Sequence, residues 1–131
     1  MRLCLRCHSR VHLGNGRGFG RHVEVMDATG TIVPRFDLMC ACLDCDVESG
    51  GTNDHAEWIS KVECGELHSV EIDGNGWIAH VTRDKVWFEG LYGQGDGGEV
   101  TFNQFIFALQ TYIRFLADPE RKPIEVEFPA Q

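Results

Sequence analysis

The sequence lacks the segments that carry a protein into or across a membrane. No apolar run among its 131 residues approaches the roughly 18 residues that a helix needs to cross a bilayer. The opening residues, MRLCLRCHSR, contain scattered arginines and no apolar core, so they do not resemble a secretory signal peptide. We therefore expect a cytoplasmic protein that does not associate with a membrane.

Motifs that would identify an enzyme are also missing. The chain has no G-x-S-x-G, H-E-x-x-H or P-loop sequence. Cys64 lies at the expected end of a helix between Glu63 and Glu66, where the helix dipole and the carboxylates favour the neutral thiol over the reactive thiolate. The glycine-rich residues 14–20 have neither dinucleotide-binding spacing nor the aromatic residues of an RNA-recognition motif. The sequence therefore predicts a protein that is not an enzyme and does not bind nucleic acid.

Positive charge is scarce in one part of the chain. The formal net charge is −8, and residues 44–73 alone hold nine acids against the single base Lys61, which also gives −8. A negative field repels phosphate backbones and attracts basic surfaces. The segment is either a solvated face that keeps the protein soluble or a binding surface for a basic partner.

Hydrophobic periodicity predicts a single α+β domain over residues 1–131, with a mainly antiparallel sheet built from hairpins. The clearest element is one long amphipathic helix within residues 100–119. Thr101 can cap its first turn, and Gln104 can complete a capping box. A second, short helix is expected at residues 54–64. Phe107 lies on the polar side of the long helix, where we expect a loop or the last strand to cover it.

Strands are expected on both sides of the short helix. They lie within residues 2–13, 22–27, 31–43, 67–92 (a three-stranded meander) and 123–129, the last as an edge strand. Residues 31–43 are apolar at both alternating positions, which favours a central strand covered on both faces. Residues 93–99 are glycine-rich and are expected to form a loop.

Two turn signals set the register of the meander. The sequence Asp-Gly-Asn-Gly at residues 73–76 is a strong hairpin signal, and it places Ile72 opposite Trp77. The second turn places Ala79 opposite Phe88. One face then becomes apolar, and we expect the long helix to cover it. The other face contains Ile78, His80 and Trp87, which we expect the hairpin at residues 22–43 to cover.

Cysteine spacing leaves one alternative open. Cys4 and Cys7 form one C-x2-C pair, and Cys42 and Cys45 form another, so four thiolates could hold a structural zinc ion. Against this, Cys40 and Cys42 lie two residues apart in an apolar run that we expect to be a strand, so they point to the same face. In such a place cysteine behaves as a small buried hydrophobe. We assign no cofactor and keep the zinc site as the alternative.

The stretch VWFEGLYGQGDGGEVTFNQFIFALQTYIRFL, residues 86–116, consists of a strand, a glycine-rich segment and an amphipathic helix. This arrangement resembles small cytoplasmic immunity proteins of bacterial polymorphic-toxin and contact-dependent growth inhibition systems. The likeness extends over residues 66–128. It implies an acidic α+β protein that neutralises a toxin, and it identifies no individual binding residue.

Charge and resemblance lead to the same hypothesis, an inhibitor that occludes the active site of a basic toxin. A nuclease is the favoured partner, because its active site must be basic to hold phosphates. Clustered carboxylates can imitate those phosphates and accelerate association. The candidate partner-binding residues are Asp44, Asp46, Glu48, Asp54, Glu57 and Glu63. The alternative is an adaptor or subunit domain stabilised by zinc at Cys4, Cys7, Cys42 and Cys45.

Overall fold

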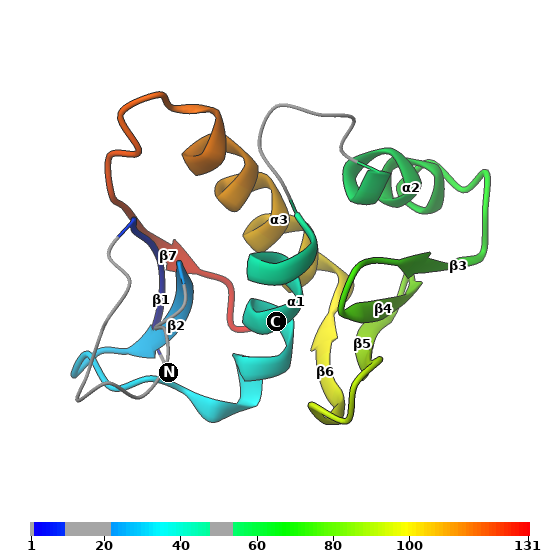
Figure 1. The fold of residues 1–131 in the computed structure, drawn as a ribbon, viewed down its shortest axis with the longest axis horizontal. Helices are drawn as coiled ribbons and strands as arrows, with labels where there is room; N and C mark the ends of the chain where they lie inside the picture. The colour runs from blue at the N-terminus through cyan, green and yellow to red at the C-terminus, as the bar shows by residue number, and fades with distance from the viewer. Residues whose placement is uncertain (1, 10–21, 48–53) are drawn as a thin grey trace.

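A computed structural model of the chain describes residues 2–9, 22–47 and 54–131. These residues form an α+β fold with two antiparallel sheets and three α-helices (Figure 1). The elements are β1 (Leu3–Cys7), β2 (Val23–Asp27), the 3-10 turn η1 (Pro34–Phe36), α1 (Asp37–Asp46), α2 (Asp54–Glu63), β3 (Ser69–Asp73), β4 (Trp77–Thr82), β5 (Lys85–Gly90), β6 (Asp96–Thr101), α3 (Phe102–Ala117) and β7 (Ile124–Phe128). None of the described helices combines the length and the apolar character that a membrane span requires.

The first sheet has the strand order β2-β1-β7. Leu3, Leu5 and Cys7 alternate along β1 and are buried, because every second side chain of a strand points to the same face. β7 follows the same rule, with Phe128 buried and its glutamates exposed. Its place at the end of the strand order confirms the edge strand expected at residues 123–129. Val11 and Leu13, also considered for an N-terminal strand, lie outside the described residues.

The second sheet has the strand order β3-β4-β5-β6. The predicted register of its second hairpin is confirmed, since Ala79 pairs with Phe88. The first hairpin is shifted by two residues, so that Ile72 pairs with Ala79 instead of Trp77. A shift of two keeps every side chain on its predicted face. The physical reason is that Gly74 N donates to the carbonyl of Trp77 at 2.8 Å, so that Asn75 and Gly76 are the two residues of the turn.

The expected loop at residues 93–99 is wrong in its second half, which belongs to β6. Its glycines suggest a loop, but one of them, Gly98, allows a close approach between this strand and α1. Gly98 has a φ of +60°, and a Cβ atom built there would lie 2.7 Å from Cβ of Leu38. Only glycine fits that contact.

The expected strand at residues 31–43 is also wrong. A bridge between Met26 and Ile32 is what remains of the expected hairpin, and the chain then enters η1 and α1. α1 contacts both sheets and buries Met39, Cys40, Cys42 and Leu43. A helix that is covered on several sides has apolar residues at both odd and even positions. Its sequence therefore has the same pattern as a strand buried on both faces. The described part of the chain therefore has two α-helices besides α3, where one was expected.

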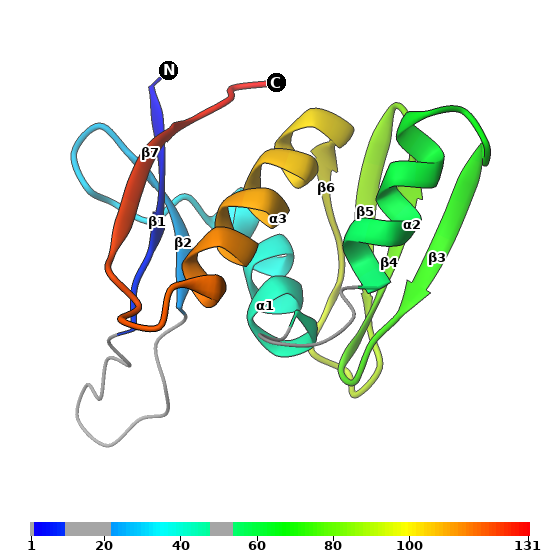
Figure 2. The same cartoon turned by 90° about the horizontal axis from the view of Figure 1, so that it is seen from above.

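The predicted capping box at the start of α3 is confirmed. The Thr101 hydroxyl accepts from Gln104 N at 3.0 Å, and Gln104 Oε1 accepts from Thr101 N at 3.0 Å. α3 is 16 residues long and lies between the two sheets (Figure 2). Phe105 contacts Phe88 of the second sheet, with ring centroids 5.7 Å apart.

The opposite side of α3 packs on the first sheet. Phe107 makes an edge-to-face contact with Phe128 at 5.9 Å, so the last strand covers it as expected. Gln104 and Thr111 are polar residues of α3, and both are buried. Gln104 Nε2 donates to the carbonyl of Pro129 at 3.0 Å. Since both sides of the helix are packed, α3 serves as a scaffold between the sheets.

The inner face of the second sheet is covered by α1, α2 and α3 together, not by α3 alone. α2 ends as predicted, with Gly65 at a φ of +84° after its last turn. The expectation that residues 22–43 cover Ile78, His80 and Trp87 is wrong, because that segment approaches the inner face as α1. No described element lies against the outer face of β4 and β5 (Figure 1).

Candidate protein-binding surface

The outer face of the second sheet carries a row of carboxylates at one end. The register pairs Asp73 with Ile78, Ile78 with Glu89, and Glu89 with Asp96. Directly paired residues of antiparallel strands point to the same face. Asp73, Glu89 and Asp96, which we call the carboxylate row, are all exposed. Glu89 and Asp96 are direct neighbours of like charge, an arrangement that destabilises a sheet.

A histidine and a tryptophan lie beside the carboxylate row. His80 stacks on Trp87 with ring centroids 5.1 Å apart and planes 5° from parallel. Its Nε2 lies 3.1 Å from a Glu89 oxygen, and its Nδ1 lies 3.6 Å from a Glu71 oxygen. The His80 side chain is 17% exposed, whereas those of Glu71 and Glu89 are 70% and 49% exposed. The rings therefore form a fixed aromatic floor between exposed carboxylates.

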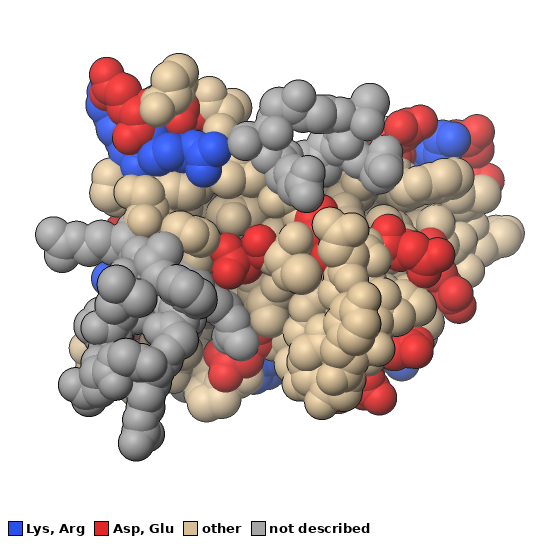
Figure 3. All heavy atoms as spheres, viewed as in Figure 1, with Lys and Arg blue, Asp and Glu red and all other residues tan. Residues whose placement is uncertain are grey.

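Lys85 demonstrates that a cation fits over this floor. Its Nζ lies 5.3 Å from the centroid of Trp87 and 3.4 Å from a carboxylate oxygen of Glu99. A cation above an aromatic ring is attracted by the negative face of the ring. In Figure 3, acidic side chains are spread over the part of the surface where Figure 1 places α2 and β3–β5, with small patches of Lys and Arg.

Two of the predicted partner-binding residues hold the fold together. Asp46 accepts from Gly76 N at 3.0 Å through Oδ1 and from Trp77 N at 3.1 Å through Oδ2. Asp44 accepts from the Tyr112 hydroxyl at 3.3 Å. Burial, together with the Asp44 carboxylate, raises the pKa of Tyr112, so the hydroxyl stays protonated and donates. Both aspartates are thus engaged inside the molecule.

The other four predicted residues are divided between exposed positions and undescribed ones. Glu57 and Glu63 are exposed on α2. Glu48 lies outside the described residues, and of Asp54 only its place at the start of α2 is described. Sequence reasoning missed Glu89 and Asp96, because they become neighbours only once residues 96–101 form a strand. The signal available was the second hairpin, which already placed Glu89 opposite Ile78.

The four cysteines of the alternative zinc site do not face one another in the way a single ion requires. Cys4 and Cys7 are three residues apart on β1 and therefore point to opposite faces of the sheet. Burial raises the pKa of Cys7 to about 12, against the opposing effect of Arg114, so its thiolate is disfavoured. Within residues 2–9, 22–47 and 54–131 no three metal-ligating side chains form a group that could hold an ion.

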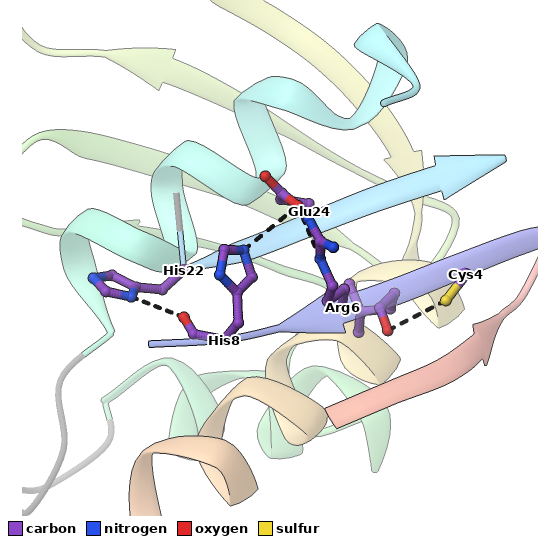
Figure 4. Close-up of polar contacts among 6 residues, drawn as sticks. Cys4, Arg6, His8, His22 and Glu24 are labelled. Carbon is purple, nitrogen blue, oxygen red and sulfur yellow. Dashed lines mark hydrogen bonds and ion pairs between the residues drawn. The ribbon is translucent and has the colours of Figure 1, made fainter. Parts of the chain in front are cut away.

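A polar cluster on the first sheet was not predicted (Figure 4). Arg6 and Glu24 are cross-strand partners, and Arg6 Nε donates to Glu24 Oε2 at 3.2 Å. His8 Nε2 lies 3.5 Å from the same oxygen. His22 Nδ1 donates to the carbonyl of His8 at 2.9 Å. The cluster joins the end of β1 to the start of β2, which is a structural role.

A comparison of the chain with protein-family models, curated proteins and solved structures found no match. Function must therefore be argued from the residues and their arrangement.

Proposed function

We propose that this protein binds and inhibits a basic protein toxin, with a nuclease domain as the favoured partner, and that the outer face of the second sheet is the binding surface. Binding, not catalysis, is the activity proposed. The observation that carries the proposal is the carboxylate row, in which Glu89 and Asp96 face each other across two strands. The resemblance of residues 66–128 to immunity proteins supports the same activity.

The carboxylate row is an electrostatic cost to the free protein. Neighbouring strands lie about 4.8 Å apart, so the Glu89 and Asp96 backbones are close, and Asp73 is roughly twice as far from Glu89. Like charges directly opposite each other destabilise a sheet by a few tenths to about 1 kcal/mol. A partner that brings arginines or lysines against the row removes this repulsion and gains an attraction. Such a surface also accelerates association with a cationic partner.

The aromatic floor supplies contact area next to the charge. Trp87 and His80 are half-buried, and their rings are held by stacking and by Glu71 and Glu89. Binding energy in protein interfaces is concentrated in aromatic and arginine side chains at a desolvated centre. The floor with its surrounding carboxylates is therefore suited to arginine side chains of a partner.

The test uses the double variant Glu89→Gln/Asp96→Asn. Both changes keep an oxygen acceptor, so the Gly90 N–H bond to Asp96 and the His80 contact of Glu89 can persist. The probes are the purified product of the neighbouring reading frame and an oligo-arginine peptide. We expect affinity to fall about tenfold, the salt dependence of Kd to weaken, and the free protein to become slightly more stable.

The matched control is Glu120→Gln, an exposed glutamate on the other side of the molecule that pairs with Lys122. It should leave Kd and its salt dependence unchanged. The proposal fails if neither probe binds, or if the double variant binds each probe with unchanged affinity and salt dependence.

A further inference from the structure

The turn between β5 and β6, residues 91–95, exposes two large apolar side chains side by side. We call this segment the Tyr92 turn. Tyr92 is 79% exposed and Leu91 is 42% exposed, and neither belongs to the hydrophobic core. Isolated exposed apolar residues are common, whereas an adjacent pair at the tip of a hairpin is a potential contact site.

The Tyr92 turn is fastened to the neighbouring turn between β3 and β4. Gln94 Nε2 donates to the carbonyl of Gly76 at 2.7 Å, and Gln94 Oε1 accepts from Tyr92 N at 2.6 Å. Leu91 N donates to the same Gly76 carbonyl at 3.0 Å. One glutamine side chain thus bridges the backbones of both turns. The backbone at Tyr92 is held although its side chain projects away from the protein.

The anchorage continues into the core of the molecule. Gly76 donates its N–H to Asp46, which belongs to α1, and α1 contacts both sheets. A chain of hydrogen bonds therefore runs from α1 through Gly76 and Gln94 to Tyr92. A loop that is already ordered loses less conformational freedom on binding, which increases affinity. Tyrosines on glycine-rich loops provide contact surface in this way in antibodies.

The charge around the Tyr92 turn is negative. Glu89 precedes it in β5 and Asp96 follows it in β6, and residues 86–113 contain no Lys or Arg. An arginine guanidinium can stack on a tyrosine ring and at the same time pair with a carboxylate, because it is planar and presents several donors. An arginine-rich surface is the partner chemistry that fits both features.

We infer that the Tyr92 turn is a preorganised anchor that recognises an arginine-rich surface of a protein partner. Tyr92 supplies the ring, Glu89 and Asp96 supply the charge, and Gln94 holds the backbone that carries the ring. The positive charge of the partner rests on the function proposed above, whereas the order of the turn stands on its hydrogen bonds alone.

The first experiment measures the order of the turn in the free protein. In 15N relaxation, the Tyr92 amide should be as rigid as amides within β5, and Gln94→Ala should make it mobile while β5 stays rigid. A mobile Tyr92 amide in the natural sequence, or an unchanged one in Gln94→Ala, overturns the preorganisation.

The second experiment titrates the protein with oligo-arginine and oligo-lysine peptides. Oligo-arginine should bind more tightly, and Tyr92→Ala should weaken it about two- to fivefold, whereas Tyr92→Phe, which keeps the ring, should bind as the natural protein does. Leu91→Ala, in the same turn, is also expected to weaken binding. The control is Ile32→Ala, which is expected to have no effect. Ile32 is also 42% exposed but lies beside the first sheet.

Each other outcome has one meaning. If Tyr92→Ala binds normally while Glu89→Gln/Asp96→Asn does not, the anchor is wrong and the acidic surface stands. If the double variant binds normally, the proposed function fails. Tyr92 resonances that shift with protein concentration alone identify a second copy as the occupant, and binding to uncharged lipid vesicles identifies a lipid surface. Either result overturns the inference.

Discussion

Replacing Asp46 with alanine should remove a clamp between α1 and the turn that joins β3 to β4. Its carboxylate accepts from two backbone N–H groups, Gly76 N at 3.0 Å and Trp77 N at 3.1 Å. A hydrogen bond to a charged group contributes about 1.5–3 kcal/mol, and a donor left buried without an acceptor adds a desolvation cost. Gly76 and Trp77 are both buried. We therefore expect Asp46→Ala to lower the free energy of unfolding by about 3–4 kcal/mol, and Asp46→Asn, which retains one acceptor, by about half of that.

The measurement is urea unfolding followed by tryptophan fluorescence and by circular dichroism. Trp58, Trp77 and Trp87 lie on α2, β4 and β5, so fluorescence reports on this part of the molecule, while circular dichroism reports on all of it. Asp84→Ala, at an exposed aspartate on the turn between β4 and β5, is the matched control and should change stability by less than about 0.5 kcal/mol. Gly74→Ala should act on the same clamp, because a Cβ at Gly74 would overlap the Asp46 carboxylate. Its effect and that of Asp46→Ala should therefore not add in the double variant. A loss below about 1 kcal/mol for Asp46→Ala, or full additivity with Gly74→Ala, would refute the clamp.

Two further predictions concern buried groups. Burial raises the pKa of Cys7 from 9.0 to about 12 and raises that of Cys42 as well, so the unfolded chain releases these protons above about pH 9 while the folded protein keeps them. The contribution of these thiols to the free energy of unfolding should be fully present below pH 9. Above pH 9 it should fall by about 1.4 kcal/mol per pH unit for each thiol. Urea unfolding at pH 8 and pH 10 should show a smaller loss of stability in Cys7→Ala than in the natural sequence. Gln104→Glu should destabilise the protein by about 1–3 kcal/mol although glutamate suits a capping box, because the carboxylate cannot donate to the carbonyl of Pro129; equal stability of the two proteins in thermal unfolding would contradict this.

The elements that could be predicted from the sequence are those whose signals are local. The capping box at Thr101 and Gln104 involves residues three apart, and the hairpin around Arg83 and Asp84 is fixed by a short turn. α1 could not be predicted in the same way. Met39, Cys40 and Leu43 are buried because both sheets and α3 surround that helix. An apolar run of this kind does not distinguish a central strand from an enclosed helix, and only the tertiary packing does.

The negative charge of the candidate surface could be predicted from the sequence, but its position in the fold could not. Net charge identified an acidic protein, but it could not show that Asp46 accepts two backbone hydrogen bonds, since its partners lie 30 and 31 residues away. The pairing of Glu89 with Asp96 was missed for a related reason. Glycines at positions 97 and 98 are typical of a loop, and the role of Gly98 in the approach of β6 to Leu38 becomes visible only with α1 in place.

Asp46, which binds backbone N–H groups, and the exposed Glu89 and Asp96 are connected through the Tyr92 turn. Asp46 fixes the turn that holds Gln94 and, through it, Tyr92. Glu89 and Asp96 contribute charge at the two ends of the same turn, at a cost in sheet stability. A sequence selected only for solubility would gain nothing from placing two carboxylates opposite each other beside an exposed tyrosine whose backbone is held by a hydrogen bond. The combination is favourable when a cationic partner covers it, because the same contact then relieves the repulsion and buries the ring.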